Sequence, residues 1–155
     1  MAAPWLIAAA SALGTIEAAG HADNPDVLAF HASVDAEHVN DAVPWCSSFV
    51  AWALARSGVP VPAGVTRLAR SWLRAADLDP VDLETARHGT IAVLRRGTSS
   101  WQGHVGLLVG RSHNALLLLG GNQQDQVTVE PYALADMLGL RWPRRGPPPA
   151  GPPLR

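Results

Sequence analysis

The hydrophobic pattern of the chain changes its period near Gly89, and this change restricts the fold more than any other feature. Before Gly89, apolar residues recur every three or four positions, which indicates amphipathic helices. After it, short apolar runs are separated by turn residues; the runs cover residues 90–94, 104–109, 115–119 and 127–130. Short strands joined by tight turns pair antiparallel. Helices followed by a run of strands predict an α+β fold, with N-terminal helices packed on a small antiparallel sheet.

The first half of the chain is expected to form four helices, three of which carry clear start or stop signals. They cover residues 1–14, 25–31, 46–57 and 67–76. Asn24 and Thr66 are residue types that cap helix N-termini, and Pro25 suits a first helical position. Gly58 suits the end of the third helix, because glycine readily adopts the left-handed conformation found there.

The last part of the sequence is expected to complete the domain near Pro143. Residues 131–138 read as a short helix and residues 140–142 as a last edge strand. From Pro143 onward, six of thirteen residues are proline, which predicts a disordered or polyproline tail over 144–155. The chain therefore reads as one domain, 1–143, followed by that tail.

Composition excludes several classes of protein. The formal net charge is −1, so no basic field argues for binding nucleic acid. A single cysteine excludes an internal disulfide. No apolar run approaches the ~20 residues of a membrane span. The N-terminus lacks the positive region of a signal peptide, so we expect a protein made in the cytoplasm.

The single cysteine, Cys46, stands at the start of the third expected helix, with Pro44 at a position that suits helix entry. One face of this helix is predicted to be buried, because apolar residues recur at Phe49, Val50, Ala53 and Leu54. Unpaired N–H groups and the helix dipole at an N-terminus favour a thiolate over a thiol. This placement suits a nucleophile; the alternative is a small buried hydrophobic residue.

A candidate base, and a residue to orient it, follow on the expected strands. Side chains alternate along a strand, so His104 and Asn122 each have a defined face. If 104–109 and 115–119 form a hairpin, its turn near Ser112 brings Asn122 beside His104. An Asn oxygen there can accept a ring N–H and leave the other ring nitrogen for a thiolate. The alternative for Asn122 is a turn residue that tolerates a left-handed φ.

Three short segments combine these candidates and resemble a known family. They are Pro44-Trp45-Cys46-Ser47-Ser48-Phe49-Val50, Gly103-His104-Val105-Gly106 and Gly120-Gly121-Asn122-Gln123. In residues and order they resemble the papain-like cell-wall hydrolases of bacteria and phages, namely the NlpC-type peptidases and the CHAP amidases. The likeness is closest to a small phage-associated subgroup, which also shares Pro4-Trp5-Leu6, Asp23-Asn24-Pro25 and Arg141-Trp142-Pro143.

The resemblance implies a papain-like fold, with the catalytic helix packed on the sheet, and hydrolysis of peptidoglycan amide bonds through a thioester. It matches Cys46 to the nucleophile, His104 to the base and Asn122 to the polar orienting position. Two positions depart from the family pattern. The strand after the base lacks the second histidine of NlpC-type enzymes, since His113 lies in the turn, and Gly120 replaces the Glu of many CHAP-type pairs.

Three further residues are candidates for binding substrate. Trp45 and Trp101 flank the expected cleft and suit stacking on a sugar or a stem peptide, with core packing as the alternative for Trp45. Gln123 is the third, with a solvated loop as its alternative. No pair of Cys and His residues shows tight ligand spacing, so we expect no metal site and no cofactor.

The sequence thus predicts a cysteine amidase or endopeptidase that cleaves the peptide part of peptidoglycan and acts on the wall after release or delivery. One alternative is a catalytically idle module that binds the cell wall. Another is a toxin or tail-borne effector that acts on a protein amide. The tail over 144–155 suggests attachment to a phage or secretion assembly.

Overall fold

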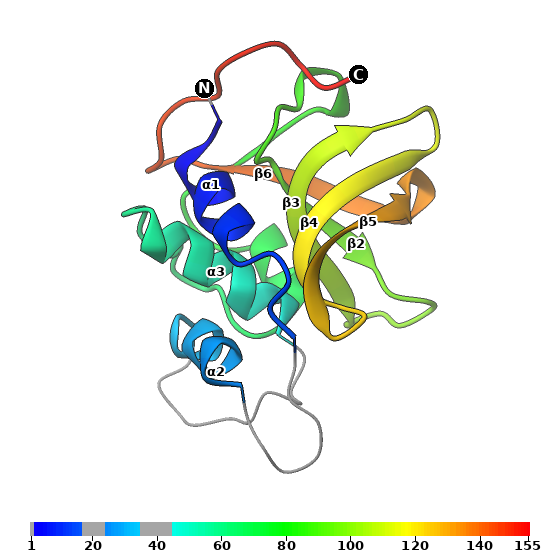
Figure 1. The fold of residues 1–155 in the computed structure, drawn as a ribbon. Helices are drawn as coiled ribbons and strands as arrows, with labels where there is room; N and C mark the ends of the chain where they lie inside the picture. Colours follow the sequence, from blue (N-terminus) through cyan, green and yellow to red (C-terminus); the bar gives the residue numbers. More distant parts are fainter. Residues whose placement is uncertain (1, 17–23, 35–44) are drawn as a thin grey trace.

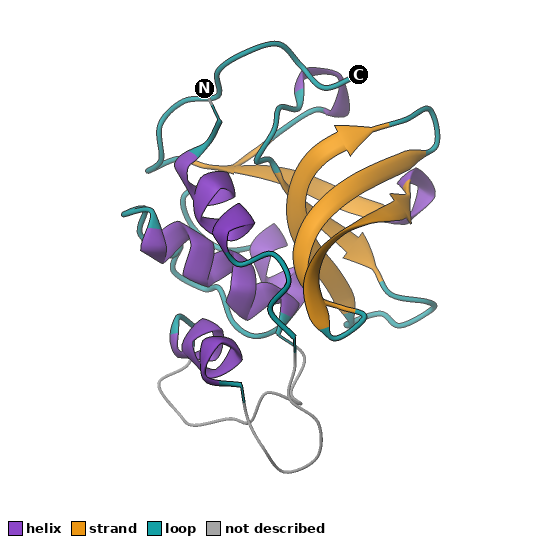
Figure 2. Ribbon diagram, in the orientation of Figure 1, coloured by secondary structure: helices purple, strands orange, loops and turns teal. Residues whose placement is uncertain are grey.

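A computed structural model describes residues 2–16, 24–34 and 45–155. Across these residues the protein has three α-helices and a six-stranded antiparallel sheet (Figures 1 and 2). The predicted α+β class is therefore confirmed. Within the same ranges, no helix is long and apolar enough to span a bilayer.

The helices begin and end close to the predicted positions. They are α1 (Pro4–Ser11), α2 (Pro25–Ala32) and α3 (Cys46–Arg56). Asn24 caps α2 as expected, its Oδ1 accepting a hydrogen bond of 2.8 Å from the backbone N–H of Asp26. Gly58 follows α3 with a φ of 82°, which is the left-handed conformation predicted for it. Pro44, expected at the entry to α3, lies outside the described residues.

The prediction of a fourth α-helix is wrong. Residues 67–76 form only a short 3-10 helix, η1 (Ala69–Leu73). Thr66 does not cap it from the expected position; its Oγ1 accepts from the N–H of Leu68, and Leu68 is the residue that precedes η1. The Ser71 hydroxyl donates to the carbonyl of Leu68 at 2.6 Å, which competes with regular helical bonding.

The strands run antiparallel in the order β1-β6-β2-β3-β4-β5. Their bounds are β1 (Leu78–Pro80), β2 (Ile91–Arg95), β3 (Gly103–Arg111), β4 (Ala115–Gln123), β5 (Gln126–Ala133) and β6 (Met137–Pro143). Two expectations are corrected. Residues 131–138 are not a helix, because β5 continues to Ala133 with alternating burial before the 3-10 turn η3 (Leu134–Asp136). The last strand, β6, lies inside the sheet between β1 and β2 rather than at its edge.

The sheet is buried on both faces, which produces two clusters of core side chains. The first cluster lies between the sheet and the helices and contains most of the large aromatic residues, among them Trp5, Phe30, Trp45, Phe49 and Trp72. The second lies on the other face of the strongly curved sheet and is made mainly of leucines, among them Leu94, Leu108, Leu116, Leu118 and Leu140 (Figure 1). In the first layer, α3 contacts β3 and β4, and α1 and α2 pack on α3.

The C-terminal residues 144–155, expected as a disordered tail, lie against the body of the protein. Leu154 is buried, and its N–H donates to the carbonyl of Ala86 at 2.8 Å. The Arg87 Nε donates to the carbonyl of Gly151 at 2.8 Å, and the indole N–H of Trp142 donates to Pro147 at 3.0 Å. Leucine 154 joins the leucine cluster, so this segment completes the second core instead of extending into solvent.

Candidate active site

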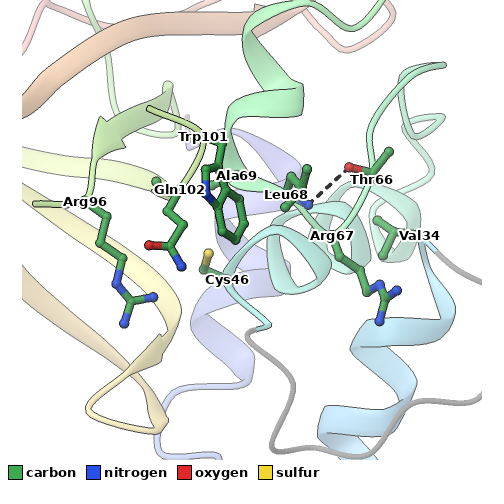
Figure 3. A pocket seen from close by; sticks show the side chains of 10 residues that line it. Val34, Cys46, Thr66, Arg67, Leu68, Ala69, Arg96, Trp101 and Gln102 are labelled. Atoms are coloured by element: carbon green, nitrogen blue, oxygen red, sulfur yellow. Dashed lines mark hydrogen bonds between the residues drawn. The ribbon is translucent and has the colours of Figure 1, made fainter. Parts of the chain in front are cut away.

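Cys46 is the first residue of α3, at the end of the helix that faces the sheet. Its side chain is 6% exposed, and it borders a cleft (Figure 3). The first N–H groups of an α-helix have no partners within the helix, so they are available to a ligand or to the sulfur itself. The backbone N–H groups of Ser47 and Val105 both point at the sulfur of Cys46 and stabilise its charged form.

The two serines after Cys46 hold the start of α3 in place. Ser47 donates from Oγ to the carbonyl of Thr66 at 2.5 Å and accepts from the indole N–H of Trp72 at 2.8 Å. Ser48 lies 2.9 Å from Nδ1 of the buried His31 on α2. Both hydroxyl groups are fully buried. These bonds anchor the N-terminus of α3 to η1 and α2, and so fix the direction in which Cys46 points.

His104 is the second residue of β3 and pairs with Leu94 of β2. Its side chain hydrogen-bonds the side chain of Cys46. Its Nε2 lies 2.9 Å from Oε1 of Gln123. Because Gln123 occupies Nε2, Nδ1 is the ring nitrogen available to the sulfur. The structure therefore brings together the predicted nucleophile and the predicted base, in the order cysteine, histidine, amide.

The amide in this chain of contacts belongs to Gln123 and not to Asn122, which corrects the predicted orienting residue. Asn122 has a φ of 57°, the left-handed conformation that was its alternative reading, and lies where the pairing of β4 with β5 changes register. This break in alternation lets Gln123 fold back under Gly120, where a Cβ would lie only 2.5 Å from Oε1 of Gln123. Gly120 therefore leaves the space in which Gln123 reaches His104.

Gln123 is held firmly, and its surroundings also correct its predicted role in substrate binding. Its side chain is 3% exposed, so it is neither a surface contact nor a solvated loop residue. Its Nε2 donates to the carbonyls of Leu118 at 3.2 Å and Thr128 at 2.8 Å. With Nε2 committed to two carbonyls, Oε1 must face His104, and it accepts from an Nε2–H of the imidazole.

Cys46 and His104 each favour the charged form of the other. Burial alone raises the pKa of the Cys46 thiol, but the hydrogen bond and charge of His104, with two backbone N–H groups, outweigh burial and lower it. Burial alone lowers the pKa of His104, but the bond to Cys46, the charge of its thiolate and the bond to Gln123 raise it. The pair therefore favours thiolate and imidazolium, the arrangement of an activated cysteine nucleophile.

Tyr132 supports the imidazole from its other side, and sequence reasoning missed it. Its ring stacks on His104 with centroids 4.8 Å apart and planes 22° apart. Burial, followed by the charges of Cys46 and Glu130, raises the pKa of Tyr132, so its hydroxyl stays neutral. The residue lies in the segment expected as a helix, and only the curvature of the sheet brings it to His104. No local pattern in the sequence marked it.

The cleft beside Cys46 has a volume of about 720 Å³. Trp101, a predicted contact for substrate, lines it with a side chain that is 59% exposed. Trp45 does not line it: its side chain is fully buried and stacks on Phe30, with ring centroids 5.7 Å apart. Its predicted contact with substrate is therefore replaced by its alternative, core packing. A Cβ on Gly121 would lie 2.7 Å from the Trp45 ring, so β4 approaches the start of α3 very closely.

Among the described residues, no three His, Cys, Asp or Glu side chains gather closely enough to hold a metal ion. The site as described is a cysteine, an imidazole and an amide beside an open cleft, and such a set can carry out acyl transfer through a covalent thioester. No protein-family model and no curated protein matches the chain.

Proposed function

We propose that the protein is a cysteine amidase or endopeptidase that cleaves an amide bond in the peptide part of peptidoglycan. The observation that carries this proposal is the continuous contact from Cys46 through His104 to Gln123, with the sulfur at a helix N-terminus and beside a cleft. Each residue has a role in such a reaction, and the charged pair is favoured before substrate binds.

In the first step, the Cys46 thiolate attacks the carbonyl carbon of the amide and forms a carbon–sulfur bond. The oxyanion that develops is stabilised by backbone N–H groups at the start of α3. The His104 imidazolium gives its proton to the amide nitrogen, the carbon–nitrogen bond breaks, and the amine leaves. A thioester remains on Cys46 and His104 is now neutral.

In the second step, neutral His104 takes a proton from water, and the hydroxide attacks the thioester carbonyl. The carbon–sulfur bond breaks, the acid leaves, and the thiolate and imidazolium are restored. Gln123 keeps the imidazole in one orientation through both steps, and Tyr132 supports its face. The net reaction is amide plus water giving acid and amine, with no external oxidant, reductant or cofactor.

The choice of peptidoglycan as target, and of a papain-like fold, rests on the resemblance of the three sequence segments to NlpC-type peptidases and CHAP amidases. The α+β order, with the cysteine on a helix and the histidine on the adjacent sheet, supports this choice. The exchange of Asn122 for Gln123 as orienting amide leaves the chemistry intact, because either amide oxygen accepts a ring N–H.

The test is mass spectrometry of fragments released from purified sacculi by the wild type and by Cys46→Ala. We expect new amino termini or freed stem peptides from the wild type alone, and their masses identify the bond. Brief incubation with substrate followed by acid quenching is expected to trap an acyl group on Cys46 of the wild type.

Two other outcomes would replace the proposal. If neither protein released fragments while both bound sacculi, the protein is a cell-wall binding module. If the wild type left sacculi intact but acted on protein amides, and Cys46→Ala did not, its chemistry stands and its target is protein.

A further inference from the structure

The described residues that line the cleft beside Cys46 carry positive charge, although the protein as a whole is close to neutral. Among the described residues that line it, the ionisable side chains are Cys46, Arg67 and Arg96, and none is a carboxylate. In Figure 3, Arg67 and Arg96 lie on opposite sides of Cys46. A cation on the wall of a concave site attracts anions and raises their local concentration.

Arg96 is the cation that lies close to the reacting groups. It follows the last residue of β2, and its charge acts on both His104 and Tyr132. Its side chain is exposed, and among the described residues no hydrogen bond or ion pair engages its guanidinium. Its neighbour Arg95 differs: the Nε of Arg95 lies 2.9 Å from Oδ1 of Asp136, in an ion pair outside the cleft.

The segment that follows Arg96 is held by hydrogen bonds within residues 99–102 and by hydrogen bonds from Arg70 of η1. The Ser99 hydroxyl accepts from the backbone N–H groups of Trp101 at 3.3 Å and Gln102 at 3.0 Å. Arg70 on η1 donates to the carbonyls of Ser99 and Gln102, both at 2.7 Å. These bonds give the backbone of the cleft wall a defined shape before substrate arrives, so the segment that carries Arg96 is held beside Cys46.

The cleft also carries exposed apolar surface. Trp101 is 59% exposed and Leu68, on the facing segment, is 50% exposed. Both line the cleft with Cys46. An exposed Trp ring, a Leu side chain and a guanidinium that line one cleft suit a ligand that is apolar along its length and carries a negative group at one point.

We propose that the cleft selects an anionic peptide, and that Arg96 binds a free carboxylate of the substrate close to the amide that Cys46 attacks. Trp101 and Leu68 contact the uncharged part of the same chain. Arg96 is a specificity-determining residue that touches substrate but no reacting atom. This inference rests on the proposed hydrolase activity and deepens it, because it names the chemical class of the substrate.

The experiment uses soluble muropeptides from the wall that the protein digests, one half left intact and the other half amidated with carbodiimide and ammonia. Amidation converts each free carboxylate into a neutral carboxamide of nearly the same shape. We expect the wild type to hydrolyse the intact peptides at about tenfold higher kcat/KM, mostly through a lower KM, since a charge-assisted hydrogen bond is lost on amidation.

Two variants assign the preference to one residue. Arg96→Gln is expected to hydrolyse both preparations with similar kcat/KM, close to the wild-type value on the amidated one. Arg95→Gln is the matched control, because it removes a neighbouring arginine outside the cleft, and we expect it to keep the wild-type preference. Arg96→Lys is expected to recover part of the preference, since it restores the charge without the planar fork.

The inference is overturned if the wild type shows no preference, or if Arg96→Gln retains it. Failure of the hydrolase proposal looks different: neither preparation is cleaved and no acyl group forms on Cys46. Equal cleavage of both preparations therefore rules out binding of a substrate carboxylate by Arg96, while the proposed hydrolase activity stands.

Discussion

The two halves of the candidate site are built from different kinds of contact. The nucleophile belongs to one continuous segment, in which Trp45, Cys46, Ser47 and Ser48 begin α3 and anchor it. The base depends on a partner 19 residues away, Gln123, and on a ring from a strand that is not its neighbour in the sheet. The helix half is thus a local structure with a packed anchor, whereas the sheet half exists only once the sheet has curved.

The difference teaches where each property of the site comes from. The helix half supplies position and one backbone N–H contact to the sulfur, from Ser47, and the sheet half supplies a second, from Val105. The sheet half supplies the charge that keeps the sulfur ionised and the proton that the leaving amine needs. Substitutions in the sheet half should therefore lower activity without displacing Cys46.

The largest effect is expected for His104→Ala. Without the imidazolium, burial dominates the pKa of Cys46, and the thiol becomes the main form at neutral pH. We expect amide hydrolysis to fall by about 10⁴-fold, as when a member of a catalytic triad is removed. Alkylation of Cys46 by iodoacetamide at pH 7 should slow by up to about 30-fold, the factor between a full thiolate and a free thiol.

His113→Ala is the matched control, since this exposed histidine lies in the turn between β3 and β4. We expect no change in either rate. Unchanged alkylation in His104→Ala would mean that the helix N-terminus alone ionises Cys46, and the comparison between the two halves would then fail.

The pH dependence of the wild type separates the two groups. Because the pKa of Cys46 is lowered, alkylation should reach half of its plateau below pH ~8.5, the value of a free thiol. Because the pKa of His104 is raised, the imidazolium persists to higher pH, and hydrolysis should fall only as pH rises through that pKa. Hydrolysis thus gives a bell-shaped profile, whereas alkylation keeps its plateau; a profile for hydrolysis with no alkaline limb would contradict the role of His104 as proton donor.

A smaller effect is expected for Gln123→Ala. The loss of its bond to Nε2 leaves the imidazole less well oriented and removes a contribution that raises the pKa of His104. We expect kcat to fall by about 10- to 100-fold with a smaller change in KM, by analogy with other residues that orient a catalytic or metal-bound His. The alkaline limb of the pH profile should also move to lower pH, which loss of packing alone would not produce.

Thr128→Val provides the comparison for this variant, because the Thr128 hydroxyl accepts from Gln123 Nε2 at 3.2 Å but lies on the side away from His104. We expect it to leave the pH profile in place. If Gln123→Ala kept full activity, the orienting role would have to come from the stacked ring of Tyr132.

The comparison also explains which parts of the molecule could be predicted from the sequence. The helix with Cys46, the cap at Asn24 and the strand with His104 follow from short-range patterns, since caps, periodicity and turns act within a few residues. The position of β6 inside the sheet does not, because strand order depends on contacts between distant segments. Leu154, expected in a disordered tail, is likewise buried through a cluster whose other members are distant in the sequence, among them Leu94 and Leu108.

The orienting amide shows the same limit at the scale of one residue. Strict alternation along β4 predicts that Asn122 shares a face with Gly120. The alternation breaks between Gly120 and Gln123, so this prediction is wrong. The left-handed conformation of Asn122 interrupts the alternation of side chains in β4, so the side chain of Gln123, the next residue, points inward. The one available signal was the sequence Gly120-Gly121-Asn122, since Asn after two glycines is a residue type that adopts this conformation.

The smallest effect is expected for Asn122→Gly, and it decides between the two amides. Glycine adopts the φ of 57° at this position without the ~1 kcal/mol that other residues lose, so fold and stability should be preserved. If Gln123 orients His104, the side chain of Asn122 is dispensable, and kcat should stay within about twofold of the wild type. A loss of tenfold or more in kcat, with an unchanged melting temperature, would return the orienting role to Asn122. Asn122→Ala also lacks the side-chain amide but strains the backbone, because alanine does not readily adopt this φ. We therefore expect it to lower the melting temperature and still leave kcat nearly unchanged. Together the two variants separate the backbone role of residue 122 from any role of its side chain.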